Sequence, residues 1–110
     1  MLEIKDNGTI YLTRGDSAYL AVNIKHKGKD YIAQDGDVLT FSVKKDVDDE
    51  EYVIKKTFYA GNAIVINPED TKHRPFGKYV YDVQMTTSRG EVFTVVEPTL
   101  FYIKEEVTHD

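Results

Sequence analysis

The chain has 110 residues, no cysteine and a formal net charge of −5 at pH 7. This length suits one domain with a single core, expected over residues 1–110, and the lack of cysteine excludes disulfides and cysteine-ligated metal sites. The acidic balance argues against nucleic acid as a partner, because phosphate recognition needs a basic surface. The sequence has no apolar window long enough for a membrane helix and no signal segment, although a mature exported form stays open.

Short runs of β-forming residues, separated by turn residues, fill the first part of the chain, and no helical period is sustained. We expect a lead-in strand at 1–5 and strands at 9–13 and 18–25, with turns at 7–8 and 14–16. Alternation in the third run turns Ala18, Leu20, Val22 and Ile24 toward the core.

The middle of the chain continues this pattern. Residues 26–30 form a hairpin loop into a strand at 31–33, and Asp35-Gly36 is a tight-turn signal. The next strand, 38–45, alternates with Leu39, Phe41 and Val43 inward. The acidic run 46–51 (D-V-D-D-E-E) is expected to be a solvated loop.

A strand at 51–60 follows, and it has a charged residue on its apolar face. Lys56 shares a face with Ile54 and Phe58, which is typical of an edge strand whose charge discourages further pairing. A turn at 61–62 then leads into a strand at 63–67.

Residues 64–85 form the corner around which the fold is organised. Pro68 suits the start of a single helical turn, and Gly77 permits an unusual φ before the next strand. In that strand Tyr79, Tyr81 and Val83 point inward. Tyr79 sits where immunoglobulin domains place a corner tyrosine, so its hydroxyl is expected to bond within 70–75. The predicted structural corner comprises Asp70, Gly77 and Tyr79.

The last strands are expected at 91–96 and 99–104, with a bulge or an edge position at Pro98 because proline lacks an N–H. The second strand is apolar on both faces, with Leu100 and Tyr102 on one side and Phe101 and Ile103 on the other. A strand with one face on the core needs only one apolar face. The other must be covered by the lead-in residues Leu2 and Ile4, by another subunit or by a further domain. The predicted interface comprises Leu100, Phe101, Tyr102 and Ile103.

Turn signals at these intervals predict an all-β fold, an antiparallel immunoglobulin-like β-sandwich of about seven or eight strands. The expected core residues share inward positions on these strands. They are Leu20, Val22, Leu39, Phe41, Val43, Ile64, Ile66, Tyr79, Tyr81, Val83 and Val92.

The sequence offers no catalytic residue, cofactor site or metal site. The three histidines, His26, His73 and His109, match no metal-ligand spacing and have no serine or acid placed beside them. Arg14-Gly15-Asp16 spells an integrin-binding tripeptide, but glycine and aspartate are expected at such a turn anyway.

Two further features leave ligand binding open. The acidic run 46–51 could supply oxygen ligands to calcium, although it lacks the EF-hand spacing and glycine. Tyr11, Tyr19 and Tyr59 are the tyrosines expected to be exposed, and aromatic side chains of this kind could form a platform for a surface glycan.

Three motifs in a fixed order carry a resemblance to a known family. Residues 9–17 (T-I-Y-L-T-R-G-D-S) look like an opening strand with an R-G-D-[ST] turn. Residues 35–44 (D-G-D-V-L-T-F-S-V-K) look like the family's G-D-x-[ILV]-x-F-x-V-K strand. Residues 68–71 (P-E-D-T) with 77–83 (G-K-Y-V-Y-D-V) look like its corner.

These motifs resemble small immunoglobulin-like modules of bacteriophages and prophages of Gram-positive bacteria, such as the N-terminal module of baseplate upper proteins. The resemblance spans most of the chain and implies a non-enzymatic structural or adaptor role in a tail or baseplate. It implies other virion proteins or self-association as partners, and a location in the virion or, for a prophage product, in the bacterial cytoplasm. The alternative is a carbohydrate-binding or cell-surface adhesin module.

Overall fold

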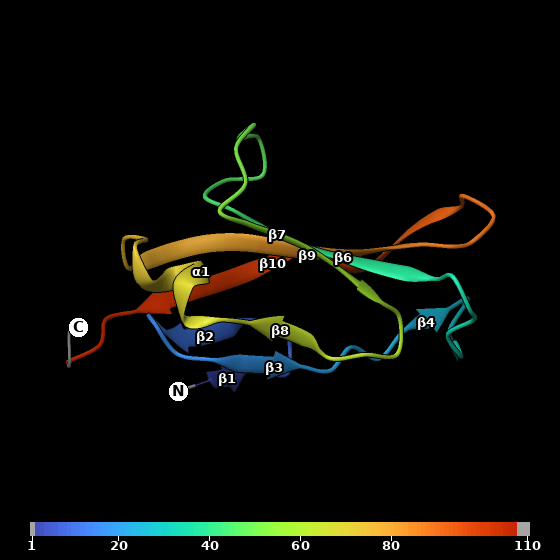
Figure 1. Ribbon diagram of the computed structural model, residues 1–110, viewed down its shortest axis with the longest axis horizontal. Helices are drawn as coiled ribbons and strands as arrows, with labels where there is room; N and C mark the ends of the chain where they lie inside the picture. The colour runs from blue at the N-terminus through green and yellow to red at the C-terminus, as the bar shows by residue number, and fades with distance from the viewer. Residues whose placement is uncertain (1, 108–110) are drawn as a thin grey trace.

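The computed structural model describes residues 2–107, and of His26 only the backbone (Figure 1). Its elements are ten strands, of two to thirteen residues, and one five-residue helix. Their bounds are β1 Leu2–Ile4, β2 Ile10–Thr13, β3 Ala18–Leu20, β4 Lys25–His26, β5 Lys29–Asp30, β6 Val38–Lys44, β7 Ile54–Tyr59, β8 Ile64–Ile66, α1 Pro68–Lys72, β9 Gly77–Thr86 and β10 Val92–Lys104. The prediction of an all-β chain is therefore confirmed, and no described helix has the length and apolarity to span a bilayer.

Six strands form one curled sheet in the order β1-β2-β10-β9-β6-β7. Strand β10 pairs antiparallel with β9, but it pairs parallel with β2, where Phe101 lies opposite Ile10. The prediction of a wholly antiparallel fold is wrong at this pair. The reason is that alternation along a strand reports which face is buried and carries no information about the direction of the neighbour.

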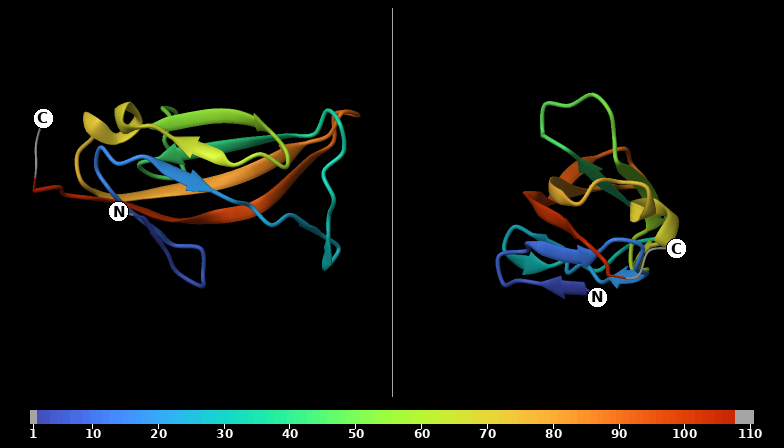
Figure 2. Two further views of the ribbon diagram at one scale, coloured as in Figure 1. Left: turned by 60° about the horizontal axis from the view of Figure 1, so that its bottom comes forward. Right: turned by 90° about the vertical axis from the view of Figure 1, so that its left-hand side faces the viewer.

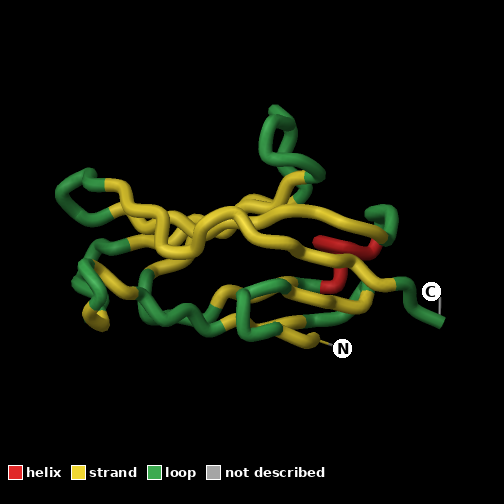
Figure 3. The backbone as a smooth tube through the Cα atoms, turned by 180° about the vertical axis from the view of Figure 1, so that it is seen from behind, coloured by secondary structure: helices red, strands yellow, loops and turns green. Residues whose placement is uncertain are grey.

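A second layer closes the curled sheet. Strands β3 and β8 pair with each other and lie below β6, β9 and β10, as Figures 1 and 2 show. The tube in Figure 3 shows helix α1 joining the two layers at the end of the molecule where the C-terminus lies. The buried side chains of both layers form one hydrophobic cluster between them.

The expected core is largely confirmed, since all its members except Val22 and Val92 are buried. Val22 is half-buried at the edge of the cluster. The prediction that Val92 belongs to the core is wrong. Val92 is 57% exposed, because its neighbour Phe93 takes the inward position opposite Met85. Because Val92 and Phe93 are adjacent in the run 91–96, the sequence pattern is compatible with either residue facing inward.

The strand predicted at 18–25 is too long, and the strand predicted at 31–33 is misplaced. The run 18–25 forms a ladder only as far as Leu20, because its partner β8 has three residues between a turn and the helix. Residues 31–33 form no strand. The hairpin lies earlier, where β4 and β5 flank Lys27 and Gly28, whose φ values of 53° and 76° suit a tight two-residue turn.

Two predictions about pairing are confirmed. Strand β7 is the edge of the large sheet. The β9–β10 register shifts between Thr94 and Val96 and again between Val96 and Thr99, which brackets Pro98. A missing N–H is accommodated at such an irregularity.

Candidate functional site

The predicted corner is present in the structure. Tyr79 is 3% exposed, and its hydroxyl donates a hydrogen bond of 2.6 Å to the carbonyl of Pro75. Asp70 accepts a 2.7 Å bond from the backbone N–H of Asn67 at the start of α1 and also pairs with Lys56 of β7. Gly77 has a φ of +141°, a conformation that side chains disfavour. Asp70, Gly77 and Tyr79 therefore have structural roles.

Removing the Tyr79 hydroxyl tests this corner. Tyr79→Phe is expected to lower the free energy of unfolding by about 0.5–1.5 kcal/mol, because the buried Tyr79 side chain loses the hydrogen bond that it donates to the carbonyl of Pro75. Urea denaturation measures the change. Tyr59→Phe is the matched control, since Tyr59 is 68% exposed. Equal stability of the two variants would show that the corner bond contributes nothing.

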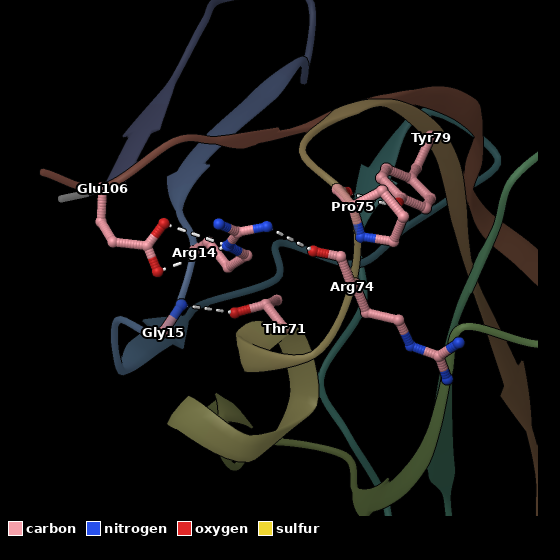
Figure 4. A network of polar contacts seen from close by, with 7 residues as sticks. All are labelled: Arg14, Gly15, Thr71, Arg74, Pro75, Tyr79 and Glu106. Carbon is pink, nitrogen blue, oxygen red and sulfur yellow. Dashed lines mark hydrogen bonds and ion pairs between the residues drawn. The ribbon is translucent and has the colours of Figure 1, made fainter. Parts of the chain in front are cut away.

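The R-G-D turn docks against this corner, as Figure 4 shows. The backbone N–H of Gly15 donates a 2.8 Å bond to the hydroxyl of Thr71, which is fully buried in α1. The Arg14 guanidinium donates 3.0 Å bonds to a carboxylate oxygen of Glu106 and to the carbonyl of Arg74. The turn, the helix and the end of the chain are thereby joined.

These contacts determine whether the Arg14-Gly15-Asp16 tripeptide is available to a receptor. The Arg14 side chain is only 19% exposed and is held between two acceptors. An arginine engaged in this way is not presented to a receptor, which supports the interpretation of residues 14–16 as a structural turn.

A further fixed carboxylate lies in the second motif, and sequence reasoning missed its role. Asp37 is 2% exposed and accepts a 2.6 Å bond from the Tyr31 hydroxyl and a 2.9 Å bond from the N–H of Gln34. These donors, chiefly the Tyr31 hydroxyl, lower the pKa of Asp37, while the same bond raises the pKa of Tyr31. Asp37 therefore holds the loop before β6 in place.

Of the three histidines, only His73 has a described side chain. His73 is exposed beside Glu69, while the side chain of His26 and all of His109 lie outside the described residues. The acidic run 46–51 is an exposed loop, as expected. Within residues 2–107, no cluster of three His, Asp or Glu residues could hold a metal ion.

The four residues of the predicted interface divide between two faces. Phe101 and Ile103 are 0% and 1% exposed in the core, so they cannot contact a partner. Leu100 and Tyr102 are half-buried on the outward face of the large sheet. Only this outward pair is open to a partner.

The outward pair belongs to a longer stripe of apolar and aromatic side chains. Register places Leu100 beside Val80, and Tyr102 beside Tyr11. The rings of Tyr11 and Tyr102 stack with centroids 4.9 Å apart and an interplanar angle of 6°. We call Tyr11, Tyr102, Leu100 and Val80 the outward stripe.

The N-terminal strand does not cover this stripe. Leu2 pairs with Leu12 and Ile4 pairs with Ile10, and both partners face the core. Because paired residues point to the same side of a sheet, Leu2 and Ile4 also lie on the inner side. Of the three alternative covers for the second face, the lead-in residues Leu2 and Ile4 are therefore excluded, and another subunit or a further domain stays open.

Next to the stripe, the outward face has a shallow depression of about 130 Å³ lined by residues that include Lys44, Val47, Tyr52, Val80 and Asp82. Burial raises the pKa of Asp82, and nearby Lys44 opposes this effect only in part.

Because the pKa of Asp82 is raised, the stability of the protein depends on pH through this group. The folded chain holds the Asp82 proton more tightly than the unfolded chain, so ionisation of this group costs stability as the pH rises through its folded pKa. Asp82→Asn is therefore expected to stabilise the protein at pH 7, with the gain vanishing below the ordinary aspartate pKa of about 3.9. Urea denaturation at several pH values measures this, with Asp48→Asn in the exposed loop as control. Loss of stability at pH 7 would mean that attraction to Lys44 outweighs burial.

The tyrosines expected to be exposed do not form one platform. Tyr19 and Tyr59 are 69% and 68% exposed, but they lie on β3 and β7 in different sheets. Tyr11 is half-buried against Tyr102, and three strands separate β2 from β7. Glycan binding thus stays a prediction, with no site built from these three residues.

Comparisons of the chain with protein-family models, with curated proteins and with solved structures found no match.

Proposed function

We propose that this chain is a non-enzymatic structural module of a bacteriophage or prophage tail or baseplate, and that it works by binding other virion proteins. The observation that carries the proposal is the ordered set of three motifs, which resemble those of phage immunoglobulin-like modules. Two of them contact each other directly, through the bond between Gly15 and Thr71. A shared order of motifs is informative when the motifs depend on one another to hold the fold.

We also propose that the all-β fold is an immunoglobulin-like sandwich. Support comes from the corner tyrosine, whose hydroxyl bonds to backbone four residues upstream, between β8 in one sheet and β9 in the other. Immunoglobulin domains place a tyrosine at the corner between their two sheets in this way.

The outward stripe is the surface proposed to bind. Contiguous apolar patches on a protein surface often mark interaction sites, and half-buried tyrosines combine apolar area with a polar group. The described part of the chain leaves this face without a covering element, whereas the inner face is closed by β3 and β8 (Figure 2).

The direct test is to purify particles from a bacterial culture that produces the phage and to identify their proteins by mass spectrometry. We expect the chain to be recovered with the tail proteins and to remain with them after tails are separated from heads. Genes for tail proteins should flank its own gene. Particles that contain the other tail proteins but lack this chain would refute the proposal.

A further inference from the structure

The outward face carries four lysines, of which Lys44 attracts nearby Asp82 without forming an ion pair with it in the described part of the chain. Lys44, Lys78 and Lys104 lie at outward positions of β6, β9 and β10, and Lys55 does so on β7. None of the four forms an ion pair with a carboxylate among residues 2–107. Lys104 instead lies over the Tyr11 ring, at 5.7 Å. Register places Lys78 beside Tyr102 and Lys44 beside Val80, so these three lysines border the outward stripe, while Lys55 lies over the Tyr52 ring.

The acidic loop 46–51 projects from the same side of the sheet. It connects β6 to β7 and rises above the upper layer in Figure 1, and the end-on view in Figure 2 agrees. All six of its residues are exposed, and its acids form no ion pair within residues 2–107. Val47 lines the depression next to Val80 and Lys44, which ties the loop to this face.

We infer that the outward face binds a second copy of this chain, with the acidic loop of each copy lying against the lysines of the other. A two-fold interface uses the same patch on both subunits, so the patch must contain both halves of every complementary pair. This face contains acids, lysines and an apolar stripe together. A patch that carries both signs of charge meets this requirement.

The molecule measures 44 × 26 × 24 Å, so one of its long sides has room for the area of about 800 Å² that a standard interface buries on each partner. In the pair, the outward stripes meet across the two-fold axis, and charge contacts at their border fix the orientation. This inference names a second copy of the chain, itself a virion protein under the proposed function, as the occupant of the outward stripe. It does not depend on the virion role, because the isolated chain can form the pair outside a virion.

Sedimentation velocity of the isolated chain provides the first measurement. We expect a dimer at micromolar concentrations that dissociates more readily at high salt, because salt screens exposed charge pairs. A chain that stays monomeric at high concentration and low salt would overturn the inference. Binding of a synthetic acidic peptide by such a monomer would not rescue it.

Charge-reversed variants provide the decisive step. One variant combines Lys78→Glu with Lys104→Glu, and the other combines Asp48→Lys with Asp49→Lys. Each alone is expected to dimerise about tenfold or more weakly, because like charges then face each other. An equimolar mixture should restore the dimer, since the acidic face of one variant meets the basic loop of the other.

The control variant combines Lys25→Glu with Lys29→Glu on the β4–β5 hairpin, away from the outward face, and should dimerise as the wild type does. Thermal unfolding of each variant checks that it is folded. A dimer that survives both reversals, or a mixture that stays monomeric, would overturn the inference.

Discussion

Phe41→Ala is expected to lower the free energy of unfolding by about 3–5 kcal/mol, out of about 5–15 kcal/mol for a domain of this size. Phe41 is fully buried at the centre of β6. Its ring lies 5.8 Å from that of Tyr81 and 6.4 Å from that of Phe101, so truncation leaves a cavity inside an aromatic cluster. Urea denaturation of the purified variant gives the value.

Thr40→Ala is the matched control, because Thr40 precedes Phe41 on the same strand and points outward. It should change stability far less. If the two substitutions had similar mild effects, the inward and outward phases of β6 would be exchanged, which a shift of one residue produces.

Phe101→Ser is expected to cost at least as much, about 3–5 kcal/mol, because it combines a cavity with a hydroxyl placed in the core. Phe101 is fully buried, and its ring meets that of Tyr81 at 6.2 Å, edge to face. Strand β10 pairs with both β2 and β9 at this residue, so the substitution removes packing contacts at the junction of three strands.

Tyr102→Ser separates the core from the outward face. It removes the stack with Tyr11, so it should cost only about 0.5–1.5 kcal/mol beyond the area lost, yet it should weaken association through the outward stripe. Unchanged stability in Phe101→Ser, with a large loss in Tyr102→Ser, would reverse the faces assigned to β10.

Local alternation predicted the strands whose two faces differ in polarity. In β6 and β9 every second residue is apolar, so the inward positions Leu39, Phe41, Val43, Tyr81 and Val83 could be predicted directly and are buried. Where apolar residues are adjacent, as at Val92 and Phe93, the pattern permits both phases. There the pairing with Met85 decides which one is inward.

Contacts between distant segments were beyond such reasoning. The parallel pairing of β2 with β10 joins Tyr11 to Tyr102, and nothing in either local pattern specifies the other strand. Likewise, Arg14 and Glu106 lie 92 positions apart, and their ion pair follows from the whole fold.

The corner was predictable because its interactions are short in sequence. Proline at the start of α1, glycine at the start of β9 and the tyrosine bond to Pro75 all act within about ten residues.

The outward stripe was predictable in part. Two apolar faces on 99–103 indicated that one needed a cover, but which side chains faced outward depended on the pairing of β10 with β9.

Under the proposed tail or baseplate role, the most direct test of binding through the outward face is site-specific photo-cross-linking in assembled particles. Tyr102 is replaced by the photoreactive p-benzoylphenylalanine, and in a control chain the same replacement is made at Tyr19, which is exposed on β3 in the other sheet. We expect position 102 to cross-link to another virion protein or to a second copy of the chain, and position 19 to give little or none. Incorporated chains that cross-link from position 19 and not from position 102 would contradict the account.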